Sequence, residues 1–208
     1  MTEAVKPSHA VIRRRRALLL VVAALFFGPL GLAFYMYYGG VSWVPHHGVQ
    51  HGQLLSEVRP VPEARLPRAQ GGTTEPTFLR HRWTLLYGVT DQCDARCVQA
   101  VADLRAIRQA LKRNQARVQV VVLGATHCCA ALQALPAQDP SVIVAWLEGA
   151  QALPVTAALT VGQMPWNAEG NVYLTDPMGN FLIFYGPSFA KKDILTDLET
   201  LLKLSHIG

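Results

Sequence analysis

Two cysteines, Cys93 and Cys97, are the residues of this chain best suited to chemistry. They lie four positions apart, where a β-type run ends and a helical pattern begins near Asp94, so both thiols fall on one helix face. A helix N-terminus offers free backbone N–H groups and the positive end of the macrodipole, which favour a thiolate. Arg96 would add to this effect if its side chain turned inward.

Three uses of this pair follow from the chemistry of thiols. A thiolate at Cys93 could attack a disulfide, with Cys97 resolving the mixed intermediate. The same two thiolates could hold Cu(I), a soft ion that accepts few sulfur ligands. In an oxidising compartment the pair could instead be a structural disulfide. We favour redox or copper function because a bridge within one helical turn constrains little chain.

A second cysteine pair, Cys128 and Cys129, follows His127 at the end of another predicted strand. Adjacent cysteines rarely bridge each other without strain, so we expect one to pack in the core and the other to be partly exposed. A sharper hypothesis is that His127 and one of these thiols approach Cys93 and Cys97 and complete a metal site. The ends of neighbouring parallel strands lie at one sheet edge, which makes this proximity reasonable.

The stretch from residue 78 to 208 supplies the elements that position these side chains. Buried apolar runs predict strands, and apolar residues at helical spacing predict helices. The predicted strands are 83–87, 118–123, 141–146, 172–175 and 181–185, and the predicted helices are 94–113, 128–135, 150–159 and 191–204. A helix between two buried strands implies a right-handed βαβ unit. The sequence therefore predicts an α/β sandwich with a mixed central sheet.

The N-terminal part predicts one transmembrane helix. Residues 17–38 carry no charged side chain, and their helical length of about 33 Å matches a hydrocarbon core of about 30 Å. Four arginines at 13–16 predict a cytoplasmic N-terminus over residues 1–16. A cleaved signal peptide is the alternative, because Gly31-Leu32-Ala33 weakly resembles a cleavage site. We favour an uncleaved anchor, since the apolar run continues past that site into aromatic residues.

The connecting segment, residues 39–77, is rich in proline and has no sustained period, so we predict a tether with local extended structure. It contains His46, His47 and His51, which could bind a metal ion, although a polar loop near the membrane is the interpretation that we favour.

The charge of the chain gives no support for nucleic-acid binding. The four arginines at 13–16 supply four of the formal charges that make +5, so the rest of the chain is nearly neutral. Half of the residues are hydrophobic and 16% are charged, which also indicates a membrane segment.

The order of elements, with a dithiol at the start of the first helix, resembles the thioredoxin fold. The CxxxC spacing, the N-terminal anchor and the hairpin sequence YLTDPMGNF resemble the Sco/SenC branch of that fold. Over about residues 17–204 the chain is similar to the small membrane-anchored proteins associated with bacterial cytochrome c oxidase genes. The shared features are a tyrosine-rich anchor end, W-x-P, HG-x-L at residues 51–54, W-x-L-x-Y, C-x₃-C and DP-x-GN.

This resemblance implies a single-pass protein of the bacterial inner membrane, with residues 78–208 forming a thioredoxin-like domain in the periplasm. It implies an accessory factor for cytochrome c oxidase biogenesis. Cys93 and Cys97 would act on copper, as Cu(I), or on the thiols of an oxidase subunit or another assembly factor. The alternatives are a general thiol–disulfide oxidoreductase, which is an enzyme, and a non-catalytic scaffold with a degenerate thioredoxin fold.

The chain departs from the residue patterns of both Sco proteins and thioredoxins. Sco proteins have a histidine copper ligand five positions before the aromatic residue of the YL pair, here Tyr173-Leu174. That position is Ala168, and residues 165–171 contain no histidine. Thioredoxins use CxxC and a proline directly before the strand that begins here at Val172, and this chain has neither.

Overall fold

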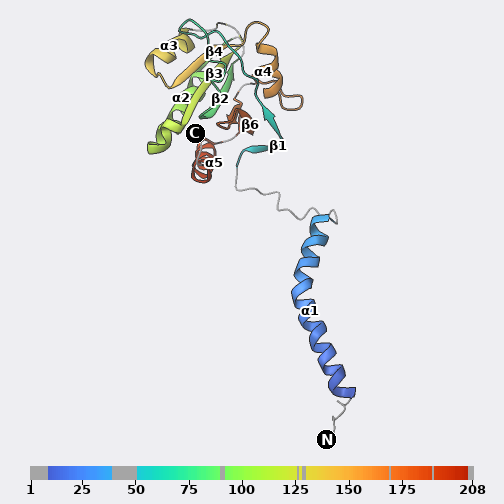
Figure 1. Cartoon of the computed structure of the whole chain (residues 1–208). Helices are drawn as coiled ribbons and strands as arrows, with labels where there is room; N and C mark the ends of the chain where they lie inside the picture. Colours follow the sequence, from blue (N-terminus) through green and yellow to red (C-terminus); the bar gives the residue numbers. More distant parts are fainter. Residues whose placement is uncertain are drawn as a thin grey trace. The chain divides into compact units, whose positions relative to one another are not determined.

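The computed structural model describes residues 9–38, 51–89, 92–125, 127, 130–168, 170–188 and 190–205. The chain divides into two compact units, Met1–His47 and Gly48–Gly208. The first contains helix α1 (His9–Tyr38), so the predicted span 17–38 is helical throughout (Figure 1). Within the described residues this is the one helix whose length and apolar composition are sufficient to cross a membrane.

The second unit is built on a six-stranded mixed sheet in the order β1-β6-β5-β2-β3-β4. Its strands are β1 (Gln53–Pro60), β2 (Trp83–Val89), β3 (Val118–Gly124), β4 (Val142–Trp146), β5 (Val172–Thr175) and β6 (Asn180–Tyr185). β2, β3 and β4 are parallel, whereas β5, β6 and β1 join by antiparallel pairing. This arrangement confirms the predicted α/β sandwich with a mixed central sheet.

Helices cover both faces of the sheet, and every residue of β2 and β3 is therefore buried. The helices are α2 (Ala95–Ala110), α3 (Ala130–Gln138), α4 (Ala152–Leu159) and α5 (Lys191–Leu204), with a 3₁₀ segment η1 (Lys112–Arg117) after α2. One apolar cluster joins the sheet to α2, α3 and α5. The other joins it to α4 and to residues from the 61–79 segment.

The segment 53–77, which the sequence pattern assigns to a tether, is part of the second unit. β1 pairs with β6 at the sheet edge, and Val61, Ala64 and Leu66 are buried in the second cluster. The pairing of β1 with β6 is irregular between Leu54 and Arg59, so the side chains of β1 do not alternate regularly between the two faces of the sheet. The rest of the predicted tether up to residue 50, with His46 and His47, lies outside the described residues.

Element boundaries differ from the prediction by a few residues. α2 ends at Ala110 rather than at residue 113, because the chain passes into η1, where Lys112 has a positive φ of 50°. In the β5–β6 turn Gly179 has φ 86°, and its N–H donates to the carbonyl oxygen of Asp176 at 3.0 Å.

Candidate functional site

The two cysteines that the sequence singles out are joined as a disulfide at the start of α2. Their Cα atoms are 5.1 Å apart. Cys93 precedes the helix and is partly buried against the core, whereas Cys97 lies in the first turn with 5% of its surface exposed. Cys93 is therefore the more accessible of the two sulfur-bearing residues.

Asp94, between the two cysteines, is the N-cap of α2. Its Oδ1 accepts hydrogen bonds from the backbone N–H groups of Arg96 and Cys97, both at 3.0 Å. The hydrogen bond from Cys97 N–H, assisted by the Arg96 guanidinium, holds the pKa of Asp94 below its usual value. The carboxylate is therefore ionised near neutral pH.

This cap changes the expected environment of the thiols. The sequence predicts free N–H groups at the helix start that favour a thiolate, but Asp94 already accepts two of them. The side chain of Arg96, 77% exposed, has its Nε 3.4 Å from Asp94 Oδ2. A thiolate formed here therefore competes with an adjacent carboxylate for the same donors.

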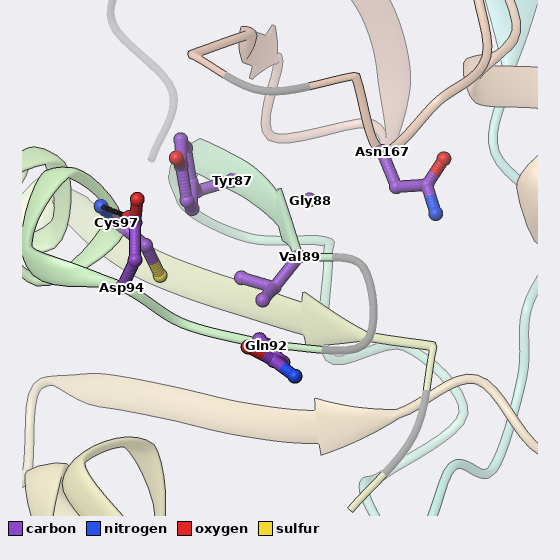
Figure 2. Close-up of a pocket in the computed structure, with 7 residues that line it drawn as sticks. All are labelled: Tyr87, Gly88, Val89, Gln92, Asp94, Cys97 and Asn167. Carbon is purple, nitrogen blue, oxygen red and sulfur yellow. Dashed lines mark hydrogen bonds between the residues drawn. The ribbon is translucent and has the colours of Figure 1, made fainter. Parts of the chain in front are cut away.

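A pocket of about 200 Å³ opens beside Cys97. Its lining residues are Tyr87, Gly88, Val89, Gln92, Asp94, Cys97 and Asn167 (Figure 2). The end of β2 forms one part of the wall, and the loop after α4 brings Asn167 to another. Gly88 is required for this approach, because a Cβ there would lie 2.7 Å from the carbonyl oxygen of Trp166. The Tyr173 hydroxyl donates to that same oxygen at 2.6 Å and holds the loop in place.

The loop residue that lines this pocket is an asparagine, next to the alanine at the position expected for histidine. Ala168 is half-buried, and Asn167 is the loop side chain at the pocket. In the part of the chain that the structure describes, no group of three or more His, Cys, Asp or Glu residues could hold a metal ion. The two cysteines could supply two sulfur ligands to Cu(I), but the described residues do not fit a site with a third, histidine ligand.

His127 is engaged elsewhere. Its ring stacks on Trp146 with centroids 4.8 Å apart, and its Nε2 lies 3.1 Å from Glu148 Oε1. The described residues therefore do not bring His127 together with the dithiol into a metal site. Cys128 and Cys129 lie outside the described residues.

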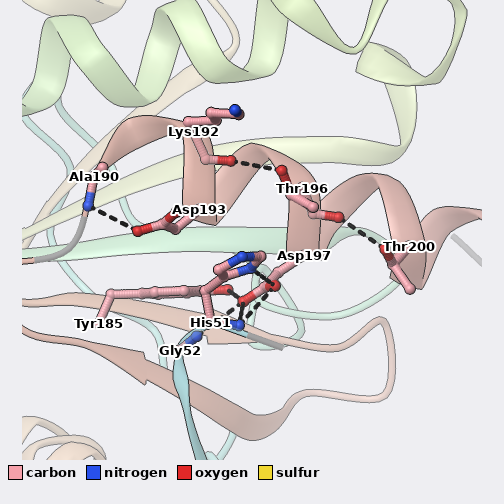
Figure 3. Close-up of polar contacts among 9 residues, drawn as sticks. All are labelled: His51, Gly52, Tyr185, Ala190, Lys192, Asp193, Thr196, Asp197 and Thr200. Carbon is pink, nitrogen blue, oxygen red and sulfur yellow. Dashed lines mark hydrogen bonds and ion pairs between the residues drawn. The ribbon is translucent and has the colours of Figure 1, made fainter. Parts of the chain in front are cut away.

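The structure also contains a polar site around Asp197, to which the HG-x-L motif at residues 51–54 contributes His51 and Gly52. The carboxylate of Asp197 on α5 has an exposed side-chain fraction of only 1%. It accepts hydrogen bonds from the backbone N–H groups of His51 and Gly52, from His51 Nδ1 and from the Tyr185 hydroxyl, at 2.9–3.0 Å (Figure 3). Figure 3 shows these donors converging on Asp197 from the start of β1 and the end of β6. We call this group the Asp197 clasp.

The electrostatics of the Asp197 clasp favour an ionised carboxylate. Burial opposes ionisation, but the hydrogen bonds from Gly52, His51 and Tyr185 outweigh it and lower the pKa of Asp197. The hydrogen bond to Asp197 raises the pKa of His51, and burial raises that of Tyr185. The HG-x-L motif marks His51 and Gly52 but not their acceptor, because Asp197 lies 146 residues from His51 along the chain.

Comparisons with solved structures agree with this fold. Apo Sco1 from Thermus thermophilus is 18% identical, covers 76% of this chain and 99% of its own, and has a TM-score of 0.56. Copper-bound ScoI from Arabidopsis thaliana is 17% identical, with 70% and 99% covered and a TM-score of 0.55. The thioredoxin domain of a thiol-disulfide oxidoreductase from Bacteroides vulgatus is 13% identical, with 71% and 99% covered and a TM-score of 0.52. At these identities the likeness shows the fold.

Comparisons of the sequence identify one family. No curated protein sequence matches this chain. A family model does match, over residues 83–205, which is more than half of the chain and includes both cysteines and the loop that faces them. The chain therefore belongs to the family described as the transmembrane-like, thioredoxin-like, C-terminal domain.

Proposed function

We propose that this protein is a membrane-anchored accessory factor for cytochrome c oxidase biogenesis, whose Cys93–Cys97 dithiol reduces a disulfide of a partner protein to two thiols. The observation that carries the proposal is the disulfide itself: two cysteines within bonding distance at a helix start, beside an open pocket. Without a third ligand among the described residues, thiol exchange is the chemistry that this arrangement supports best.

The exchange takes two steps. In the reduced protein the thiolate of Cys93, the more accessible sulfur, attacks one sulfur of a partner disulfide and releases the other as a thiolate. Cys97 then loses its proton and attacks the sulfur of Cys93, which releases the second partner sulfur and closes the Cys93–Cys97 disulfide. Two electrons pass to the partner, which ends as a dithiol, and a dithiol protein must reduce the pair again.

The partner class follows from similarity to Sco proteins. One similar structure is of BsSco, described as a member of the Sco family of cytochrome c oxidase assembly proteins in which a disulfide switch was identified. It is 15% identical to this chain and has a TM-score of 0.52. A copper-binding oxidase subunit, whose cysteines must be reduced before they accept copper, is a partner with the required chemistry.

The proposed topology follows from α1. We infer an inner-membrane anchor over residues 17–38, a cytoplasmic N-terminus over residues 1–16, and a periplasmic thioredoxin-like domain that contains the dithiol. The apolar composition of α1 and the four arginines before its uncharged part support this orientation.

Trapping the mixed disulfide tests the exchange. The full chain with Cys97→Ser should accumulate a covalent complex with its partner through Cys93, whereas Cys93→Ser should not. Both variants carry Cys128→Ser and Cys129→Ser, so that Cys93 or Cys97 is the remaining thiol. Complexes are isolated from membranes under acid quench and identified by mass spectrometry. Equal or absent trapping in the two variants would contradict the proposal.

Copper delivery is the second candidate, because the two sulfur atoms could bind Cu(I) as cargo in a two-coordinate site. Copper-bound neighbours such as yeast Sco1, at 16% identity and a TM-score of 0.56, share the fold. Anaerobic titration of the reduced full chain with Cu(I), in competition with a chelator, tests this function. A wild-type affinity no greater than that of the Cys93→Ser, Cys97→Ser variant would exclude it.

A further inference from the structure

Four consecutive arginines near the start of α1 have no carboxylate near them in the sequence. Residues 13–16 are all arginine and all exposed. No Asp or Glu occurs between Glu3 and Glu57, a stretch that includes the whole of α1. No side-chain carboxylate of residues 4–56 can therefore pair with these arginines, and an anionic group from outside this part of the chain can bind them.

The helix distributes these arginines around its axis. α1 is continuous from His9, so residues 13–16 are helical. Successive residues of an α-helix are turned by about 100°, so four of them surround most of the circumference while rising only about 4.5 Å along the axis. They form a ring rather than a stripe. Each Cα–Cβ bond tilts toward the helix N-terminus, so the side chains lean away from the apolar segment.

The ring lies at the depth of lipid phosphates when α1 spans a bilayer. Residues 17–38 are uncharged, and their length of about 33 Å fills a hydrocarbon core of about 30 Å. The residues just before them then enter the polar headgroup layer, which is about 5–7 Å thick on each side. The rings of Phe34 and Tyr38, 4.4 Å apart, end the span with the aromatic residues typical of the opposite interface.

We propose that this arginine ring binds the headgroups of anionic phospholipids in the leaflet where α1 begins. Guanidinium groups bind phosphate oxygens in a bidentate manner, and a net negative headgroup adds an attraction that a zwitterionic one lacks. Because the ring surrounds the helix, anionic lipids are recruited on all sides of it. The inference rests on the proposed membrane anchor but not on the dithiol chemistry.

Lipid selectivity of the full chain tests this proposal. The protein is reconstituted in phosphatidylcholine vesicles with a trace of spin-labelled phosphatidylglycerol or spin-labelled phosphatidylcholine. Electron paramagnetic resonance then measures the fraction of each label restricted at the protein surface. We expect phosphatidylglycerol to be favoured by a factor of at least about five, the factor expected for one basic residue at an anionic surface.

Two charge variants make the result specific. Replacing the arginines at 13–16 by glutamine should bring the selectivity close to one, and replacing only Arg14 and Arg16 should reduce it partly. A control variant removes the same charge from exposed positions of the second unit, with Lys112, Arg113, Lys192 and Lys203 replaced by glutamine, and should keep the wild-type selectivity.

The outcomes separate this inference from the proposed function. Equal restriction of the two lipids by the wild type would overturn lipid recognition while leaving the anchor intact. Unchanged selectivity after replacement of the arginines at 13–16 by glutamine would do the same. Release of the wild-type protein from vesicles by alkaline carbonate would overturn the anchor itself, and with it the lipid site.

Discussion

The dithiol pocket and the Asp197 clasp are both polar sites of the second unit, but they are constructed in opposite ways. The Cys93–Cys97 disulfide closes within one short segment, Asp94 and Cys97 of that segment line the pocket, and the pocket is open to solvent. The clasp joins segments that are 145 and 146 residues apart, and its carboxylate is buried with donors already bound to it. Chemistry needs accessible groups, whereas a buried and fully hydrogen-bonded carboxylate stabilises a fold.

The clasp also has a definite architectural position. It fixes the start of β1, the first described part of the chain after α1, to α5 at the C-terminal end. We therefore expect loss of the Asp197 carboxylate to reduce stability more than loss of the disulfide does, and substitutions in the dithiol to reduce function while the chain stays folded.

Replacing Asp197 by alanine should have the largest effect on stability. It leaves the N–H groups of His51 and Gly52 and the Tyr185 hydroxyl without their acceptor. We expect the free energy of unfolding to fall by about 3–5 kcal/mol, measured by urea denaturation of the full chain in detergent with tryptophan fluorescence. Asp193→Ala, one turn earlier on α5, is the control and should cost about 1 kcal/mol or less. Equal losses in the two variants would show that the clasp has no special role.

Replacing Gly52 by alanine should have the next largest effect. A Cβ at this position would collide with Ile183 Cγ2 and would lie 2.5 Å from Tyr185 Cε1. The start of β1 would have to move away from β6, at a cost of about 1–3 kcal/mol. Gly186→Ala is the matched control, because its nearest neighbour would be 3.8 Å away. Hydrogen exchange of the β1 amides should increase in the Gly52 variant alone.

Reduction of the Cys93–Cys97 disulfide should have a smaller effect. The bridge closes a loop of only five residues, which corresponds to about 2 kcal/mol in the chain-entropy model. We expect the reduced chain to remain folded, with its near-ultraviolet circular dichroism retained. The Cys93→Ser, Cys97→Ser variant should match the reduced protein and should not respond to dithiothreitol. Unfolding on reduction would instead identify the bridge as structural.

The pH dependence of the clasp should be the smallest effect, because the His51 side chain is 46% exposed. The raised pKa of His51 gives stability that is present below about pH 6.5 and is lost as the pH rises through the folded-state pKa. The lowered pKa of Asp197 gives stability that is lost as the pH falls below about 4.

The stability difference between wild type and His51→Gln should therefore be largest between about pH 4 and 6.5 and should shrink above that range. Asp197, Asp193 and Lys192 are the charged groups that act on His51, and the Tyr185 hydroxyl shares the carboxylate of Asp197. A difference that grows as the pH rises would contradict the assigned ion pair. Urea denaturation at a series of pH values provides the measurement.

The sequence predicted what depends on local patterns. Periodicity predicts strands β2 to β6, the helices and their mixed arrangement, but not β1, and the four-residue spacing places Cys93 and Cys97 on one turn. The absence of histidine from residues 165–171 is likewise a property of the sequence itself. The capping of α2 by Asp94 could not be predicted from the sequence. An aspartate three positions before Cys97 can cap the helix or extend into solvent, and the backbone geometry decides between the two.

What depends on distant contacts could not be predicted. β1 has a register irregularity and gains its stability from pairing with β6 and from Asp197, neither of which leaves a local signal. The metal-ligand role of His127 stays a prediction, because Cys128 and Cys129 lie outside the described residues. The contact of His127 with Glu148 could not be predicted, because Glu148 lies beyond β4.

In the function that we propose, the dithiol rather than the fold alone is required for cytochrome c oxidase biogenesis. The direct test is cytochrome c oxidase activity in membranes of cells whose single copy of this protein carries Cys93→Ser and Cys97→Ser, normalised to the amount of the protein present. We expect oxidase activity to be lost although the variant accumulates as a folded membrane protein. Oxidase activity equal to that of cells with the wild-type protein would contradict the account and would favour a non-catalytic scaffold.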